Sequence, residues 1–306
     1  MKRIVLLAGG LSSEREVSLM SANSVRPYLE EMGYKVIMVD AGVNLAEELK
    51  KYMPDLVFNC LHGTYGEDGA VQGLLEVMQV PYTHSGVRAS AVAFSKDVTK
   101  YIATYGGIRT PKFIVIDVDE YFAMLKIKQD PMSKPYVLKP IAQGSTVGIY
   151  IVLDDSSILP NALEWKFGPK VIVEEYILGI DLFAAVIRDK ACGVIEVRPK
   201  SGFYDYTAKY TEGAAEHVMP ADVPSDVYQC AMLYAEKMHK LLDCRTISRS
   251  DFRYDPRYGT NGLYFLEINT HPGFTDMSLF PEIAKYSGIS FVQIIQMLLE
   301  DAQCEL

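Results

Sequence analysis

Apolar and polar positions alternate over the first ninety residues in a way that predicts strands separated by helices. Regular alternation of strands and helices is typical of a parallel sheet with helices on its faces. In such sheets ligands bind beyond the carboxyl ends of the strands, where Gly9-Gly10 and His62-Gly63 fall in this sequence. The predicted elements are strands at 3–7, 35–39 and 56–61 and a helix at 45–53.

The start of the first helix is predicted from a pair of polar residues. Ser13 and Glu16 have the spacing of a capping box, in which both side chains satisfy free backbone N–H groups at a helix start. We therefore expect a helix that begins here and runs to about Gly33.

The pattern changes after about Phe94 and again near Gly179, which indicates two further regions. A chain of 306 residues is also longer than most single hydrophobic cores. We expect three domains, at residues 1–93, 94–178 and 179–306. The predicted elements of the last two are strands at 137–140 and 171–175 and helices at 95–105, 225–242 and 290–303.

Composition narrows the class of protein. An apolar fraction of 49% excludes a disordered chain, and a net charge of −9 argues against a general nucleic-acid binder. The five cysteines, at 60, 192, 230, 244 and 304, lack paired spacing and predict reduced thiols, not disulfides or a zinc site. The N-terminal apolar run is too short for a signal peptide, and no run approaches a membrane span. We expect a soluble, cytoplasmic protein.

A candidate metal site lies in the apolar, aromatic run 263–270. Glu267 and Asn269 are two positions apart on a predicted strand, so their side chains lie on one face. Asn261-Gly262 is a hairpin signal that would bring the strand carrying Asp251 alongside. Two carboxylates and an amide oxygen suit a hard cation such as Mg²⁺. A satisfied polar network is the alternative unless the chain also holds a phosphate-binding apparatus.

A candidate phosphate site follows the strand at 137–140. Lys139 offers a positive charge at the strand end, and glycines in the small-residue loop 144–148 let backbone N–H groups approach an anion. The loop is not a Walker A sequence, and a plain β-hairpin turn explains it equally well. Lys96, on the helix at 95–105, is a second candidate, with a solvated helix lysine as the alternative.

Two further segments have the composition of a nucleotide site. The strand 171–177 contains Glu174 and Glu175, and Asp181 follows. Apolar walls with carboxylates suit an adenine and a ribose, whereas two surface carboxylates are the alternative. The segment 203–210 is dense in aromatic and polar groups and predicts a loop that closes over a ligand, with ordinary domain packing as the alternative.

The order of these features resembles the ATP-grasp fold, and short strings narrow the resemblance to the D-alanine–D-alanine ligase family. The resemblance runs from about residue 3 to the last helix. The strings that carry it are 9–18, Leu61-His62-Gly63, 66–69, Pro81-Tyr82-Thr83, Ser85-Gly86, Lys139-Pro140, 144–148, 203–206, Lys209-Tyr210, Glu267-Ile268-Asn269-Thr270 and 272–275. Two positions depart from the family pattern: 141–143 lacks a charged residue that relatives often carry, and Thr146 stands where a serine is usual.

The resemblance implies an α/β protein, with an ATP-grasp fold preceded by an N-terminal Rossmann-like parallel-sheet domain. It implies ligation of two D-alanines with ATP through a D-alanyl phosphate, for peptidoglycan precursors and hence cell shape. It also implies two Mg²⁺ ions, with Mn²⁺ as a substitute, and a homodimer. The alternatives are an ATP-grasp ligase for another amine and a nucleotide-binding regulator that has lost catalysis, although none of the site residues is missing.

The resemblance also implies roles for individual residues. The metal ligands would be Asp251, Asn269 and a bridging Glu267. The nucleotide ligands would be Lys96 and Lys139 at the α- and β-phosphates, Lys209 at the γ-phosphate, Ser145 in the loop, and Glu174, Glu175, Ile177 and Asp181 around adenine and ribose. The amino-acid ligands would be Glu14 and His62 at the first D-alanine, Arg249 and the Gly273 backbone at the oxyanion, and Ser278 and Leu279 at the second D-alanine. Tyr210 and Ser145 would link the covering loop to Glu14, and Tyr210 implies a dipeptide product instead of a depsipeptide.

Overall fold

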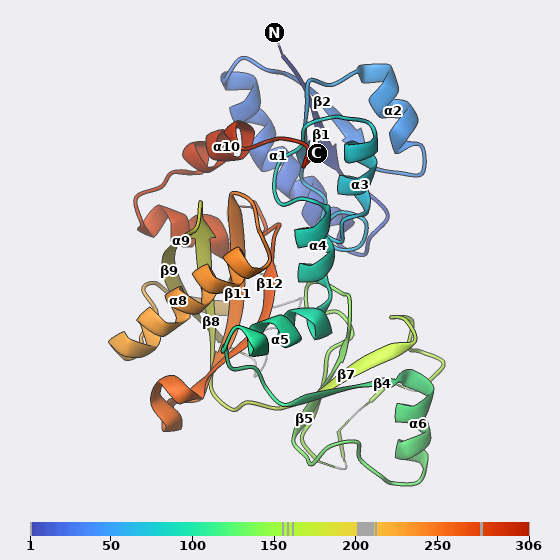
Figure 1. The fold of residues 1–306 in the computed structure, drawn as a ribbon, viewed down its shortest axis with the longest axis vertical. Helices are drawn as coiled ribbons and strands as arrows, with labels where there is room; N and C mark the ends of the chain where they lie inside the picture. Colours follow the sequence, from blue (N-terminus) through green and yellow to red (C-terminus); the bar gives the residue numbers. More distant parts are fainter. Residues whose placement is uncertain are drawn as a thin grey trace.

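Three sheets make up the frame of the protein (Figure 1). The computed structural model describes residues 2–154, 156–157, 159–160, 162–200, 211, 213–275 and 278–305. The sheets have the strand orders β2-β1-β3, β4-β7-β5-β6 and β10-β9-β8-β11-β12. Each lies within one of the three predicted domains, and the boundaries between those domains stay a prediction.

The first sheet is parallel, as the alternating pattern predicted. It consists of β1 (Arg3–Ala8), β2 (Lys35–Asp40) and β3 (Leu56–Asn59), with β1 in the centre. Side chains of β1 point alternately to the two faces, so Ile4 and Leu6 pack with α1 (Arg15–Glu31). Val5 and Leu7 face the other way. They pack with α2 (Leu45–Tyr52) and α3 (Ala70–Val77).

Helix α1 starts differently from the predicted capping box. It begins at Arg15, with Glu14 in the N-cap position and no capping hydrogen bond from that side chain. Ser12, not Ser13, makes the local contact: its hydroxyl accepts from the Glu14 backbone N–H at 3.0 Å and donates to the His62 carbonyl at 2.6 Å. A tertiary contact therefore fixes this turn, because Ser12 is tied to the segment after β3.

The second sheet is antiparallel. Its strands are β4 (Phe113–Asp117), β5 (Tyr136–Pro140), β6 (Tyr150–Val152) and β7 (Lys170–Glu175). Helix α6 (Val118–Lys126) packs on it through Tyr121 and Phe122. Helices α4 (Val87–Phe94) and α5 (Lys96–Tyr105) connect this sheet with the first one (Figure 1).

The third sheet is antiparallel and is covered on both faces. It contains β8 (Ile180–Ile187), β9 (Lys190–Pro199), β10 (Ala215–Val218), β11 (Ile247–Tyr254) and β12 (Leu263–Asn269). Leu182 and Ala184 face α8 (Ser225–Leu241). Phe183 and Ala185 face α9 (Leu279–Tyr286) and α10 (Phe291–Glu300), which also pack against α1 in one continuous core. Within the described residues, no helix combines the length and apolar character needed to cross a membrane.

The pairing of β11 with β12 is as predicted, but the connection between them is not. Asp251 and Glu267 are direct partners in the antiparallel ladder. The strands are joined by a kinked 3₁₀ segment, Pro256–Gly262, and not by a two-residue Asn-Gly turn. The Asp255 side chain caps this segment by accepting from the Arg257 backbone N–H. This local cap stabilises a connection that is longer than a two-residue turn. Asn261-Gly262 lies at the end of that connection and does not form the turn.

Candidate active site

Two neighbouring clefts lie between the sheets: the polar cleft borders loops of all three sheets, and the apolar cleft lies between the second and the third. The polar cleft is lined by Glu14, His62, Glu67, Lys96, 143–145, Arg249, Glu267, Asn269, Gly273, Ser278 and Leu279, among others. The apolar cleft is lined by Val137, Lys139, Thr146, Ile149, Ile151, 174–177, Asp181, Asp251, Phe252, Arg253 and Leu266, among others. Phe183 and Glu267 line both clefts, so the two cavities share one wall.

Glu14 is held at one end of the polar cleft by close contacts with two loops. Ser145 donates a hydrogen bond to its carboxylate from the loop between β5 and β6. A Cβ on Gly63 would lie 2.5 Å from Glu14 Oε2, and one on Gly144 would also clash with that carboxylate. The two glycines therefore let both loops approach Glu14, whose exposed fraction is 5%.

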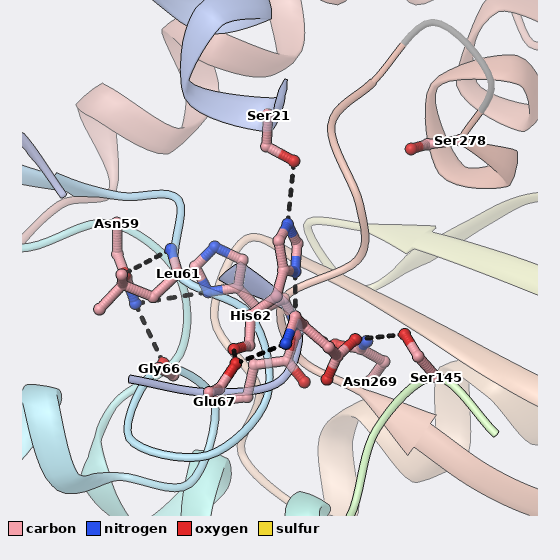
Figure 2. Close-up of polar contacts among 12 residues, drawn as sticks. Ser21, Asn59, Leu61, His62, Gly66, Glu67, Ser145, Asn269 and Ser278 are labelled. Carbon is pink, nitrogen blue, oxygen red and sulfur yellow. Dashed lines mark hydrogen bonds and ion pairs between the residues drawn. The ribbon is translucent and has the colours of Figure 1, made fainter. Parts of the chain in front are cut away.

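His62 is fixed in orientation by a partner on each ring nitrogen. Nε2 lies 2.9 Å from Ser21 Oγ, and Nδ1 lies 3.1 Å from Glu67 Oε1 (Figure 2). Asn59 supports the same loop, because its side chain donates to the Gly66 carbonyl and accepts from the Leu61 backbone N–H. The imidazole is therefore presented to the polar cleft in one orientation.

Lys96 and Glu267 bring opposite charges together in the polar cleft. Lys96 Nζ lies 3.0 Å from Glu267 Oε2 and donates to the Gln143 carbonyl at 2.6 Å. The Lys96 backbone N–H also donates to the Ile141 carbonyl, which joins the start of α5 to the loop after β5. The interpretation of Lys96 as a solvated helix lysine is wrong, since the side chain is buried.

The three candidate metal ligands come together on β11 and β12. Asp251 and Glu267 are cross-strand partners, and Asn269 is two residues beyond Glu267. Asp251 accepts two hydrogen bonds from Arg249, at 2.7 and 2.9 Å, and Asn269 Oδ1 accepts from the His271 backbone N–H at 2.6 Å. The described residues contain no group of three or more His, Cys, Asp or Glu side chains able to hold a metal. The candidate set of two carboxylates and one amide nevertheless fits Mg²⁺, which prefers few carboxylates and keeps other positions for water and phosphate.

Glu174 lies inside the protein between two lysines. Its carboxylate forms ion pairs with Lys139 and, at 2.7 Å, with Lys100 Nζ. Burial acts to raise the pKa of Glu174, but the two ammonium groups outweigh this and lower it. The interpretation of Glu174 as a surface carboxylate is wrong, because its exposed fraction is 2%, whereas Glu175 is exposed.

The apolar cleft has further charged groups at its rim. Asp181 forms an ion pair with Arg253 at 2.6 Å, and Arg253 Nε donates to the Ile177 carbonyl at 3.0 Å. Thr146 faces this cleft from the small-residue loop, where it and Ser145 have positive φ values of 67° and 49°. Such a backbone conformation is costly for residues with side chains and is concentrated at functional sites.

The far end of the polar cleft is formed by the segment between β12 and α9. Ser278 Oγ accepts from the Thr275 backbone N–H at 3.0 Å, and a Cβ on Gly273 would lie 2.8 Å from that oxygen. Leu279 begins α9 next to this hydroxyl. The predicted closing loop 203–210, with Lys209 and Tyr210, lies outside the described residues.

Comparison with known proteins identifies the family. Residues 102–300 match the family described as D-ala D-ala ligase C-terminus, and residues 39–85 match D-ala D-ala ligase N-terminus. The D-alanine–D-alanine ligase of Wolbachia pipientis wMel is 51% identical over 302 residues, or 98% of this chain and 94% of that protein. The chain belongs to the D-alanine–D-alanine ligase family. A ligase of the same name from Rickettsia bellii is 45% identical and covers 99% of this chain.

Solved structures agree with this membership of the D-alanine–D-alanine ligase family. The ligase of Bacillus anthracis superposes with a TM-score of 0.80 at 29% identity, covering 98% of this chain and 97% of that one. The same ligase complexed with ATP gives 0.77 at 26% identity. The VanG D-Ala:D-Ser ligase of Enterococcus faecalis gives 0.79 at 29% identity and covers 98% of each chain. The expected fold, ATP-grasp preceded by a parallel-sheet domain, is confirmed.

Two residues near the candidate site of this ligase-family member were missed at the level of sequence: Arg253 lines the apolar cleft, and Lys100 pairs with Glu174 behind it. Lys100 occurs four residues after Lys96, a spacing that is ordinary on a solvated helix face. Arg253 follows Asp251 by two positions and therefore lies on the same face of β11. That spacing was the available signal for Arg253, and Lys100 is identified only by its partners in the fold.

Proposed function

We propose that this protein uses ATP to join two D-alanines into D-alanyl-D-alanine, releasing ADP and phosphate, for peptidoglycan precursor synthesis. The observation that carries the proposal is the shared wall between the two clefts. Glu267 lines both the polar cleft, which suits amino acids, and the apolar cleft, which suits a nucleotide. A phosphoryl group transferred from one substrate to the other would pass this carboxylate.

The nucleotide would occupy the apolar cleft. Ile177 and its neighbours provide apolar walls for the adenine, and Glu174, Glu175 and Asp181 provide carboxylate partners for its amine and the ribose. Lys96 and Lys139 would neutralise the α- and β-phosphates beside the loop that carries Ser145, and Lys209 would neutralise the γ-phosphate. Mg²⁺ or Mn²⁺ would be held by Asp251, Glu267 and Asn269. Two Mg²⁺ ions bound there would neutralise charge on the phosphate groups.

The two D-alanines would occupy the polar cleft. Glu14 would bind the ammonium of the first, with His62 beside it, and Ser278 with Leu279 would bind the carboxylate of the second. Arg249 and the Gly273 backbone N–H would stabilise the negative oxygen that develops at the reacting carbon. Tyr210 would join the covering loop to Ser145 and Glu14.

The chemistry follows from the poor reactivity of a carboxylate. Transfer of the γ-phosphoryl group to the first D-alanine gives an acyl phosphate and ADP. The neutral amine of the second D-alanine then attacks the carbonyl carbon, the carbon–oxygen bond breaks to release phosphate, and the proton lost from the nitrogen leaves with the phosphate. The protein holds the reacting atoms in position and neutralises charge, which is most of what phosphoryl transfer requires.

Product analysis tests this proposal. The purified protein is incubated with ATP, Mg²⁺ and D-alanine, and products are separated by chromatography. We expect D-alanyl-D-alanine, ADP and phosphate in equal amounts. Formation of no dipeptide from D-alanine, with phosphate release only when another amine is supplied, would assign the protein to a different carboxylate–amine ligase.

The proposal also assigns a role to each domain and an oligomeric state to the protein. We assign residues 1–93 to D-alanine binding, 94–178 to the nucleotide, and 179–306 to the metal and the reacting atoms. We also propose a homodimer. Sedimentation at micromolar protein concentration measures this state, and a mass of one chain would contradict the dimer.

A further inference from the structure

Lys100 is a buried charge that the reaction outlined above does not use. Its side chain has an exposed fraction of 0% and lies behind Glu174, lining neither cleft of the described structure. Nζ lies 2.7 Å from Glu174 Oε2 and donates to Thr110 Oγ1 at 3.0 Å. It also lies 5.7 Å from the centre of the Phe113 ring. The ammonium of Lys100, which projects from α5, is therefore held by Glu174 on β7 and by Thr110 in the segment before β4.

The combined charge of Lys100, Glu174 and Lys139 determines how strongly Lys139 can attract a phosphate group. Glu174 alone would neutralise Lys139, and a neutral pair attracts an anionic phosphate only weakly. Lys100 adds a second positive charge, so the three groups together carry a net charge of +1 and Lys139 remains effectively cationic. Burial lowers the pKa of Lys100 to about 8, against the opposing effect of Glu174, so the ammonium is still present at neutral pH.

Lys100 also fixes the position of the Glu174 carboxylate. Lys100 engages one carboxylate oxygen, Oε2, and Lys139 engages the other, Oε1. A carboxylate has about four lone-pair positions, so acceptor capacity remains for an additional donor. Without Lys100, Glu174 would be free to turn entirely toward Lys139 and away from the apolar cleft.

We propose that Lys100 is a positioning residue for the nucleotide, which holds Glu174 in place and preserves the net positive charge at Lys139. The inference rests on the proposed function in one respect, the binding of ATP in the apolar cleft. Lys100 itself would touch neither ATP nor D-alanine. Its loss would therefore weaken nucleotide binding selectively, and a general packing defect would affect both substrates.

The test compares Lys100→Met with the exposed-helix control Lys126→Met. We expect Lys100→Met to raise the KM for ATP and the Kd of a non-hydrolysable ATP analogue by about tenfold or more. The KM for D-alanine should stay within about twofold of the unmodified protein, and Lys100→Arg, which retains the charge, should recover part of the ATP affinity. The control should bind both substrates normally.

Each outcome bears on the inference. A folded Lys100→Met protein with unchanged ATP affinity, or with equal losses for ATP and D-alanine, would overturn it. If that variant does not fold, Thr110→Val decides instead, because it removes only the hydroxyl that anchors Nζ. A several-fold rise in the analogue Kd supports the inference, and an unchanged Kd overturns it. Failure of the unmodified protein to bind the analogue would contradict the proposed function itself.

Discussion

The Ser145 hydroxyl donates a hydrogen bond to the Glu14 carboxylate, although the two residues are 131 positions apart in the sequence. The contact joins the loop between β5 and β6 to the start of α1. Both residues line the polar cleft. The second sheet therefore contributes directly to the end of the cleft where the first D-alanine is proposed to bind.

Ser145→Ala should weaken the use of D-alanine. A hydrogen bond to a charged group contributes about 1.5–3 kcal/mol, which corresponds to a loss of roughly ten- to hundredfold in kcat/KM for D-alanine. Steady-state kinetics with D-alanine as the varied substrate measures it. Ser24→Ala is the matched control, because Ser24 makes its hydrogen bond to Met20 on the exposed side of α1. Equal kinetics of the two variants would contradict the role of the Ser145 contact.

Gly63→Ala should damage activity more than stability. Gly63 and Gly107 both have φ of +70°, so alanine adds a similar backbone strain of about 1–2 kcal/mol at each. Only at Gly63 does the new Cβ meet Glu14, since Gly107 has no atom within 4 Å of that position. We expect Gly63→Ala to lose at least as much thermal stability as Gly107→Ala, because its Cβ also meets Glu14, and a large loss of ligase activity only for Gly63→Ala. Full activity of a folded Gly63→Ala protein would show that Glu14 tolerates displacement.

Glu267→Gln should slow the reaction by orders of magnitude while the protein stays folded. The change removes a charge proposed to hold Mg²⁺ and also removes the ion pair with Lys96. The measurements are the rate of phosphate release over a range of Mg²⁺ concentrations and the free energy of unfolding. Glu216→Gln, an exposed change on β10, is the control. Loss of stability without a rate defect would support the satisfied polar network instead of the metal site.

Acid should destabilise the protein through His239. Burial lowers the pKa of His239 to about 4, from an ordinary value of 6.5. The unfolded chain therefore binds a proton first as pH falls, so stability decreases from about pH 6.5 down to about pH 4. The difference of about 2.5 pKa units corresponds to about 3.5 kcal/mol at 1.4 kcal/mol per unit.

Urea unfolding across this pH window tests the role of His239. His239→Asn, which can keep a hydrogen bond to Ser248, should reduce the acid sensitivity. Part of the acid sensitivity should remain in this variant because of His84, whose pKa is lowered to about 3 by burial and by His62. His217→Asn, at a half-exposed residue paired with Glu282, is the control and should leave the pH dependence steep. An unchanged slope in His239→Asn would exclude His239 as a source.

The second acceptor should be an amine. Tyr210 is a neutral phenol that neither repels an arriving ammonium nor supplies a charge favouring D-lactate. We expect the dipeptide to dominate over the depsipeptide near pH 7 and to increase as more amine is neutral. Tyr210→His should shift product toward D-lactate as pH falls and the imidazole becomes charged. Competition between D-alanine, D-serine and D-lactate measures this, and mostly depsipeptide from the unmodified protein would contradict it.

Particular residues show why parts of the fold could be predicted from the sequence. Successive side chains of a strand point to opposite faces of the sheet. An unbroken apolar run such as Ile4 to Leu7 therefore indicates that both faces of the sheet are covered. The position of the strand carrying Asp251 beside the strand carrying Glu267 was also predicted correctly. The strand alternation depends on a short-range pattern, whereas the Asn-Gly signal predicted the neighbouring strands correctly and their connection wrongly.

Other features depend on contacts that no local pattern encodes. The capping box at Ser13 failed because the His62 carbonyl, 50 positions from Ser12, binds the Ser12 hydroxyl and sets the turn. Lys100 was overlooked because spacing on a helix does not tell which face will be buried. The roles of Lys209 and Tyr210 rest on the resemblance, since both lie outside the described residues.

The wall shared by the two clefts has a thermodynamic consequence. Any ligand in one cleft that moves Phe183, or that moves Glu267 or changes its charge, alters the free energy of binding in the other cleft. By linkage the effect is reciprocal, so nucleotide and amino acid must change each other's affinity by the same factor. A single molecule that fills both clefts would bind its second half intramolecularly and gain from a high effective concentration. Inhibitors that bridge this wall should therefore bind far more tightly than either fragment alone.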